Sequence, residues 1–333
     1  RVRDALNSED LSIYHHLSLG LTAACTCHGS ANTIGGENAI IKLRWGASPE
    51  GLLLEGQRPV QKFALGENVR QSNVTGPLRR YPATRMGVEQ LIRDSFRAAE
   101  EYSREWAAYR EKSQKDKTLV PPRRDLRLEP LVEILEGKRQ LQVHAYRQDE
   151  ILALIRTAEN MGFKVEFFIH VLEGYKVAEA LKNHGAMPTT FVDVWSGKAE
   201  TFDGIPYNGA LLYSQGLTTS FHSDFPVTYR QMNLEAAKAV KYGGVPEEDA
   251  LKFVTINPAK QLRIDSATGS LEKGKDADFV IWNGNPLSTY TSCEQTWIDG
   301  RRYFDRDEDR EMRASMEKQR AELLRKAAKG GKK

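Results

Sequence analysis

The feature that most constrains the fold is a repeated alternation of short β-rich runs with stretches of helical periodicity. Amphipathic helices follow several of the runs, for example at 148–161, 173–184 and 232–242. This alternation predicts a parallel sheet with its helices outside, and about 250 residues of it favour a closed barrel over an open sheet. The seven β-rich runs are 21–25, 39–44, 62–65, 141–145, 164–169, 189–194 and 217–222.

Seven runs are one short of the strands in a TIM-type (β/α)8 barrel, so we expect the first strand to be missing or upstream of Arg1. The rival architecture, a doubly wound open sheet, normally has a glycine-rich phosphate loop after its first strand. Residues 29–36 include glycines but do not fit G-x-G-x-x-G. We therefore predict an α/β fold built on a TIM-type barrel.

The pattern changes after Pro258. Turn-rich residues at 269–278 precede short β runs at 279–282 and 295–298. We predict a barrel domain over 1–258, the C-terminal part of a small β-sandwich domain over 259–305, and a charged helical tail over 306–333.

Composition narrows the class of protein. The 333 residues are 40% hydrophobic, which suffices for one large domain plus a small one. Much of the excess behind the net charge of +3 lies in 310–333, so we do not expect a nucleic-acid binder. No apolar run reaches the roughly 20 residues that span a bilayer. Because the chain starts at Arg1 without Met, its compartment stays open, and so does assembly into a homo-oligomer.

Cys25, Cys27 and Cys293 are too few and too scattered for a disulfide framework. The pair Cys25-x-Cys27 also lacks the second pair that a structural zinc site would need. We expect all three to be packing residues.

Three ionisable residues fall at the C-terminal ends of predicted strands, where a barrel carries its catalytic side chains. His144 and His170 each end a run, and Asp224 follows a third. Whole strand-plus-helix units separate them, so we expect all three to point into one mouth of the barrel. Two imidazoles and a carboxylate suit a zinc-like divalent ion. Such an ion lowers the pKa of its bound water towards ~7 and so makes a hydroxide nucleophile, whose proton Asp224 could accept.

Other residues are weaker candidates for this site. Glu67 lies just beyond a predicted strand and could bridge two metals, or it could cap a loop. His222 lies two residues before Asp224, and we expect it to point to the opposite face of the strand. The role of His28, in a loop that could face the mouth, stays open.

The most specific segment is Thr255-Ile256-Asn257-Pro258-Ala259-Lys260 followed by 269–282. Together with Val143-His144-Ala145, Ile169-His170 and His222-Ser223-Asp224 in this order, it resembles the amidohydrolase superfamily, in its imidazolonepropionase-related or prolidase-like branch of metal-dependent hydrolases. The resemblance covers roughly 19–304 and implies a barrel whose chain returns to a β-sandwich.

By this resemblance, His144 and His170 match the metal histidines of strands five and six. Asp224 matches the strand-eight aspartate that binds metal and shuttles the proton. Glu67 would take the strand-four position, where relatives carry a carboxylated lysine or an acid, whereas Lys62 and Lys42 are less well placed.

One departure from the family is the absence of its first metal motif, His-x-His, together with the first half of the sandwich. We expect both to lie immediately upstream of Arg1. A second departure is His144-Ala145-Tyr146-Arg147, where imidazolonepropionases carry His-x-x-Glu after strand five.

We therefore predict an amidohydrolase that uses one or two divalent ions, with zinc the best match, to hydrolyse a C–N bond in a small molecule. Candidate substrates are a cyclic amide, an N-acyl amino acid or a dipeptide-like compound. Arg147, Tyr175 and Arg230 lie on predicted loops and could hold a substrate carboxylate. Two alternatives stay open: a catalytically inactive barrel that serves as a binding or scaffold protein, and a deaminase of the same superfamily.

Overall fold

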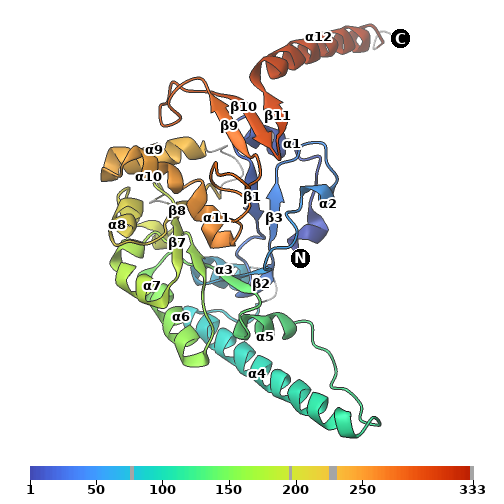
Figure 1. Cartoon of the computed structure of the whole chain (residues 1–333), viewed down its shortest axis with the longest axis vertical. Coiled ribbons are helices and arrows are strands. Elements are labelled where there is room, and N and C mark those ends of the chain that lie inside the picture. Colours follow the sequence, from blue (N-terminus) through green and yellow to red (C-terminus); the bar gives the residue numbers. More distant parts are fainter. Residues whose placement is uncertain (76–78, 195–196, 225–230, 331–333) are drawn as a thin grey trace.

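The largest sheet runs in the order β2-β4-β5-β6-β7-β8 in a computed structural model that describes residues 1–75, 79–194, 197–224 and 231–330 (Figure 1). Strands β4 to β8 are parallel, and β2 pairs antiparallel with β4. The strands are β2 (Ile34–Glu37), β4 (Val60–Ala64), β5 (Gln140–His144), β6 (Phe167–Ile169), β7 (Met187–Thr190) and β8 (Ser220–Phe221). Within the described residues this sheet does not close into a barrel.

Helices follow the parallel strands, as the sequence pattern predicts. The helix α6 (Gln148–Met161) begins soon after β5, buries Ile151, Leu154 and Ala158, and ends at Gly162 in the left-handed conformation. Each later strand is also followed by helical turns: η2 (Gly174–Lys176) and α7 (Ala178–His184), then η3 (Ala199–Thr201) and α8 (Asn208–Ser214), then α9 (Met232–Gly243), α10 (Glu247–Lys252) and α11 (Ile256–Leu262). The carboxyl ends of β4 to β8 therefore lie along one edge of the sheet.

The core of this region lies between the sheet and α4 (Arg85–Lys115). Ile92 and Phe96 occupy one face of α4 at a helical spacing, and both are fully buried. The Phe96 ring stacks on Phe163 with ring centroids 4.0 Å apart. Burial of each such side chain contributes about 2 kcal/mol. Beyond Ala99 most of α4 is exposed and extends away from the sheet (Figure 1).

The prediction that runs 21–25 and 39–44 are barrel strands is wrong. They form β1 (Ala23–Thr26) and β3 (Ala39–Lys42), an antiparallel pair separate from the larger sheet. Strand β2 pairs with β4 in the larger sheet and overlaps the glycine-bearing segment 29–36. Its two glycines interrupt the apolar pattern by which a strand is predicted. Periodicity identifies a strand but not the strand with which it pairs.

A second sheet has the order β11-β10-β9 and is antiparallel. It consists of β9 (Phe279–Trp282), β10 (Cys293–Ile298) and β11 (Arg301–Asp305). Ile298 and Phe304 share a core with Leu17 of α1 (Leu11–Leu17) and Ile41 of β3. The division at 258 and the β-sandwich stay predictions, and residue 258 lies inside α11.

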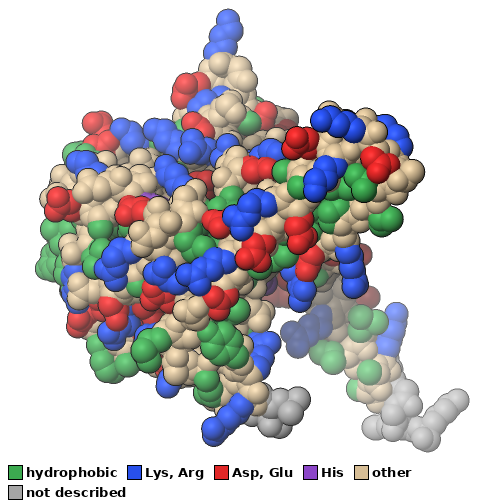
Figure 2. Space-filling model, turned by 90° about the horizontal axis from the view of Figure 1, so that it is seen from below, with side chains coloured by type: hydrophobic (Ala, Val, Ile, Leu, Met, Phe, Trp, Pro, Cys, Tyr) green, Lys and Arg blue, Asp and Glu red, His purple; other side chains and the backbone are tan. Residues whose placement is uncertain are grey.

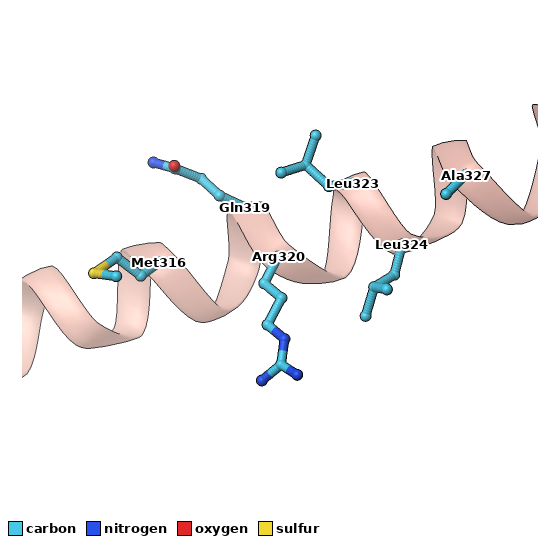
Figure 3. A pocket seen from close by; sticks show the side chains of 6 residues that line it. All are labelled: Met316, Gln319, Arg320, Leu323, Leu324 and Ala327. Carbon is cyan, nitrogen blue, oxygen red and sulfur yellow. The ribbon is translucent and has the colours of Figure 1, made fainter. Parts of the chain in front are cut away.

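The remaining helices include α12 (Arg306–Gly330), which extends from the body on the side opposite α4 (Figure 1). Met316, Leu323 and Leu324 are exposed along it, and Figure 3 shows these side chains projecting from the helix. Shorter helices are η1 (Val2–Ala5), α2 (Pro49–Leu52), α3 (Gly66–Val74) and α5 (Glu129–Leu135).

The surface mixes charges of both signs. Figure 2 shows Lys and Arg side chains interspersed with Asp and Glu, and hydrophobic side chains between them. Among the described residues, the structure contains no helix with the length and apolar character needed to cross a membrane.

Candidate metal centre

Two predicted ligands, His170 and Asp224, have a strained backbone. His170 directly follows β6 and has φ 67°, and Asp224 lies beyond β8 with φ 56°. Left-handed conformations are costly for residues other than glycine and cluster at functional sites. His170 is buried, whereas the Asp224 side chain is 40% exposed. The pair thus joins an interior imidazole to a carboxylate that solvent can reach.

The side chains of His170, His222 and Asp224 converge. One potential ligand atom from each lies within 4.8 Å of the other two. The distance from His170 Nε2 to Asp224 Oδ1 is 3.8 Å. The ring centroids of His144 and His170 are 4.5 Å apart, so His144 adjoins the same cluster. Four residues at or just beyond the ends of β5, β6 and β8 are therefore brought together, and they include three of the four predicted ligands, namely His144, His170 and Asp224.

His144 is the last residue of β5, and a hydrogen bond orients its side chain. Its Nδ1 lies 3.0 Å from Ser30 Oγ, which orients the ring. Its Nε2 and the Nδ1 of His170 are both buried, and neither has a hydrogen-bond partner in the described part of the chain. Buried polar atoms without partners are rare in native proteins, and a metal ligand is one accepted reason for them.

The electrostatics keep these imidazoles neutral. Burial, followed by the charge of Lys62, holds the pKa of His144 well below its usual range. Burial and the neighbouring His144 do the same for the pKa of His170. A neutral imidazole offers a lone pair to a metal, so the donor set fits a divalent ion that binds nitrogen and oxygen.

The prediction that His222 faces away from the site is wrong. Its ring centroid lies 4.6 Å from that of His170. Residues two apart along a strand share a face, so the spacing of His222 and Asp224 was itself a signal for a shared site. Strand β8 also ends at Phe221, before either residue.

Glu67 is not brought into this cluster. It lies in the first turn of α3, and its carboxylate accepts a hydrogen bond from Gln71 one turn later. Lys62, in the middle of β4, is 2% exposed, and its charge contributes to the lowered pKa of both His144 and His170. Its Nζ donates to the backbone oxygen of His28 at 2.7 Å and lies 3.4 Å from Cys27 Sγ. Which of the two residues takes the strand-four position stays a prediction.

The predicted substrate residues are placed as follows. Arg147 Nε and Nη2 both donate to Asp149, at 2.9 and 3.1 Å. The Tyr175 hydroxyl donates to the backbone oxygen of Asp203 at 3.1 Å. Arg230 lies outside the described residues. The substrate role of all three stays a prediction.

Sequence reasoning missed a buried acid pair beside α3. Arg85 donates to Glu150 at 2.7 Å and to Glu200 at 2.6 Å, and the backbone N of Glu67 also donates to Glu200. Burial and the charge of Glu200 raise the pKa of Glu150 to about 7. Gly66 makes the arrangement possible, because it has φ 81° and a Cβ there would lie 2.6 Å from Glu200. No local pattern relates these residues, which come from distant parts of the chain.

Comparison with known proteins identifies the family. The model of the amidohydrolase family, Amidohydro_3, matches residues 90–304. The chain belongs to the amidohydrolase family. Amidohydrolases are metal-dependent hydrolases that act on carbon–nitrogen bonds and have a TIM-like barrel fold, so the predicted resemblance is confirmed.

Individual amidohydrolases match over different lengths. The chain is 33% identical over 322 residues to amidohydrolase tasK of Hapsidospora irregularis. This match covers 91% of the chain but 32% of tasK. It is 33% identical over 103 residues to an imidazolonepropionase of Picrophilus torridus, with 30% of the chain and 25% of that protein covered. The chain thus spans a third or less of the length of these curated relatives.

A solved structure matches most of the chain. The amidohydrolase from Thermotoga maritima MSB8 superposes with a TM-score of 0.83 at 32% identity, over 91% of this chain and 77% of that one.

Proposed function

We propose that the protein is a metal-dependent amidohydrolase that hydrolyses a C–N bond in a small molecule. The observation that carries the proposal is the convergence of His170, His222 and Asp224 within 4.8 Å at the carboxyl edge of the sheet. The substrate class is a cyclic amide, an N-acyl amino acid or a dipeptide-like compound.

The chain supplies the ligands for the ion. His144, His170, His222 and Asp224 would hold one or two divalent ions, and their nitrogen and oxygen donors suit zinc. A bound ion would polarise the substrate carbonyl and lower the pKa of a coordinated water. Lys62 rather than Glu67 would fill the strand-four position, because it is buried on β4 beside the histidines.

Asp224 has a second role in this proposal. Its carboxylate is partly exposed and lies 3.8 Å from His170 Nε2, so it can contact both the ligand cluster and a substrate in the mouth. It would accept the proton of the nucleophile and pass it to the leaving nitrogen. Ser30 would keep the His144 ring in the orientation that presents Nε2 to the cluster.

The test measures metal content and hydrolysis together. Purified protein should contain zinc or a similar ion by elemental analysis, and the His170→Ala and Asp224→Asn variants should lose both the ion and activity on a panel of N-acyl amino acids, dipeptides and cyclic amides. His184→Ala is the matched control, because both His184 ring nitrogens have partners within the protein, Val165 and Glu159. This variant should keep its metal.

Two results would contradict the proposal. One is protein that binds no divalent ion under conditions where it is folded. The other is release of ammonia from an amino-substituted ring without cleavage of any amide, which would indicate a deaminase.

A further inference from the structure

Lys198 brings a positive charge to the mouth of the metal cluster. It lies in the segment after β7 and is the residue that precedes η3. Its Nζ lies 5.1 Å from the centroid of the Tyr146 ring. That ring in turn lies 4.8 Å from His144 and 5.5 Å from His170. The Tyr146 ring therefore contacts both the ammonium of Lys198 and the predicted ligands. The charge of Lys198 also lowers the pKa of both histidines.

The ammonium of Lys198 has only neutral partners in the described structure. It donates to Asn68 Oδ1 at 2.6 Å and faces the Tyr146 ring, and no carboxylate of a described residue lies within ion-pair distance. Arg85 and Arg147 differ, because each already binds a carboxylate of the protein. A lysine has three donor hydrogens, so Lys198 retains donors for an anion that enters the mouth.

The backbone around Lys198 is fixed in place. The oxygen of Lys198 accepts hydrogen bonds from the N and the Oγ1 of Thr201, at 3.1 and 2.8 Å. Glu200, two residues further on, is fully buried and bound by Arg85 and the backbone of Glu67. The cation is therefore presented by an anchored turn, which lowers the ordering cost of binding a ligand.

We propose that Lys198 binds the carboxylate of the substrate and so selects compounds with a carboxylate near the scissile C–N bond, such as N-acyl amino acids and dipeptides. That the bound compound is a substrate rests on the proposed function. The binding of a carboxylate by Lys198 is itself independent of metal and of turnover. Lys198 acts here as a specificity residue, and Tyr146 and Asn68 position its ammonium.

The experiment measures binding without catalysis. In the full chain carrying Asp224→Asn, calorimetry compares the Kd of an N-acetyl amino acid with that of its carboxamide, in the presence of a chelator. We expect the acid to bind at least about tenfold more tightly than the amide, as charge-assisted hydrogen bonds do. Adding Lys198→Met should abolish this preference, and Lys198→Arg should retain most of it.

A matched control is Lys182→Met, because Lys182 likewise donates to a neutral oxygen, that of Gln215, on the outer helix α7. It should leave the acid preference unchanged. Three results would overturn the inference. The Asp224→Asn chain could show no preference for the acid, the preference could survive in Lys198→Met, or it could be lost in Arg147→Met instead. If the preference depends on Lys198 while wild-type protein with metal hydrolyses nothing on the panel, the proposed function fails and the carboxylate site stands.

Discussion

Two buried lysines on neighbouring parts of the fold have opposite surroundings. Lys42 on β3 is 0% exposed and Lys62 on β4 is 2% exposed. Lys42 binds three carboxylates, those of Asp276, Asp278 and Asp299, and it thereby joins β3 to the second sheet. Lys62 has a backbone oxygen and a thiol as partners, and it adjoins neutral histidines.

The contrast distinguishes an acidic cluster that a lysine of the chain neutralises in part from the candidate metal centre. By spacing alone, Asp276, Asp278 and Asp299 could hold a metal, just as His170, His222 and Asp224 could. Lys42 contacts all three aspartates and Arg44 contacts Asp299, so two cations of the chain offset most of the negative charge and a metal would have to displace Lys42. His144 Nε2 and His170 Nδ1 have no hydrogen-bond partner among the described residues. We therefore expect the charge balance of a cluster to be a better guide to its role than the spacing of its ligands.

The largest effect should come from the histidine cluster. We expect His170→Ala and Asp224→Asn to lower kcat/KM by on the order of 10³-fold, because the Lewis acid contributes several kcal/mol to the transition state. Steady-state kinetics with matched metal analysis checks this. If Asp278→Asn in the other cluster removed the metal as well, the distinction between the two clusters would fail.

Lys42→Met should act on stability and leave the metal in place. It removes the cation of Asp276 and Asp278, whereas Asp299 keeps Arg44, and the side chain of Asp278 is 2% exposed. We expect the free energy of unfolding to fall by about 3 kcal/mol, as when one partner of a buried ion pair is removed. Urea denaturation checks the stability, and elemental analysis of the folded fraction checks the metal. Loss of metal with unchanged stability would reverse the assignment.

Lys62→Met should show the opposite pattern. Because no carboxylate of a described residue forms an ion pair with Lys62, its removal leaves no buried acid uncompensated in that part of the chain. We expect metal affinity or activity to fall by about 10–100-fold, as for groups that support a metal site, with little change in urea midpoint. Glu67→Gln is the comparison variant and should retain more activity than Lys62→Met.

The acid pair around Arg85 should make the stability of the protein depend on pH. Burial and the charge of Glu200 raise the pKa of Glu150 from 4.5 to about 7. The fold favours the protonated form, so the stability from Glu150 is complete below pH 4.5 and is lost as the pH rises to about 7. Over that pH window the free energy of unfolding of the wild type should fall by up to ~3 kcal/mol more than that of Glu150→Gln. Urea titrations at a series of pH values measure this, and equal slopes for both proteins would contradict it.

Much of the site was predictable because it is local to strand ends. His144 ends β5 and His170 directly follows β6, and strand-end position alone selects them. The helix predicted at 148–161 is observed with the same bounds, because a strong apolar period and a glycine at its end define it. The roles of Lys62, Ser30 and Lys198 were not predictable in this way, since each depends on a neighbour from another part of the chain.

The sequence by itself determined the α/β alternation and the strand ends that carry two histidines and an aspartate, because periodicity and local turn chemistry depend on residues close in the chain. The tertiary structure decided the pairing of β1 with β3, the approach of His222 and the different partners of Lys42 and Lys62. Strand pairing and the compensation of buried charge depend on which distant segments meet, and a linear pattern carries no record of that.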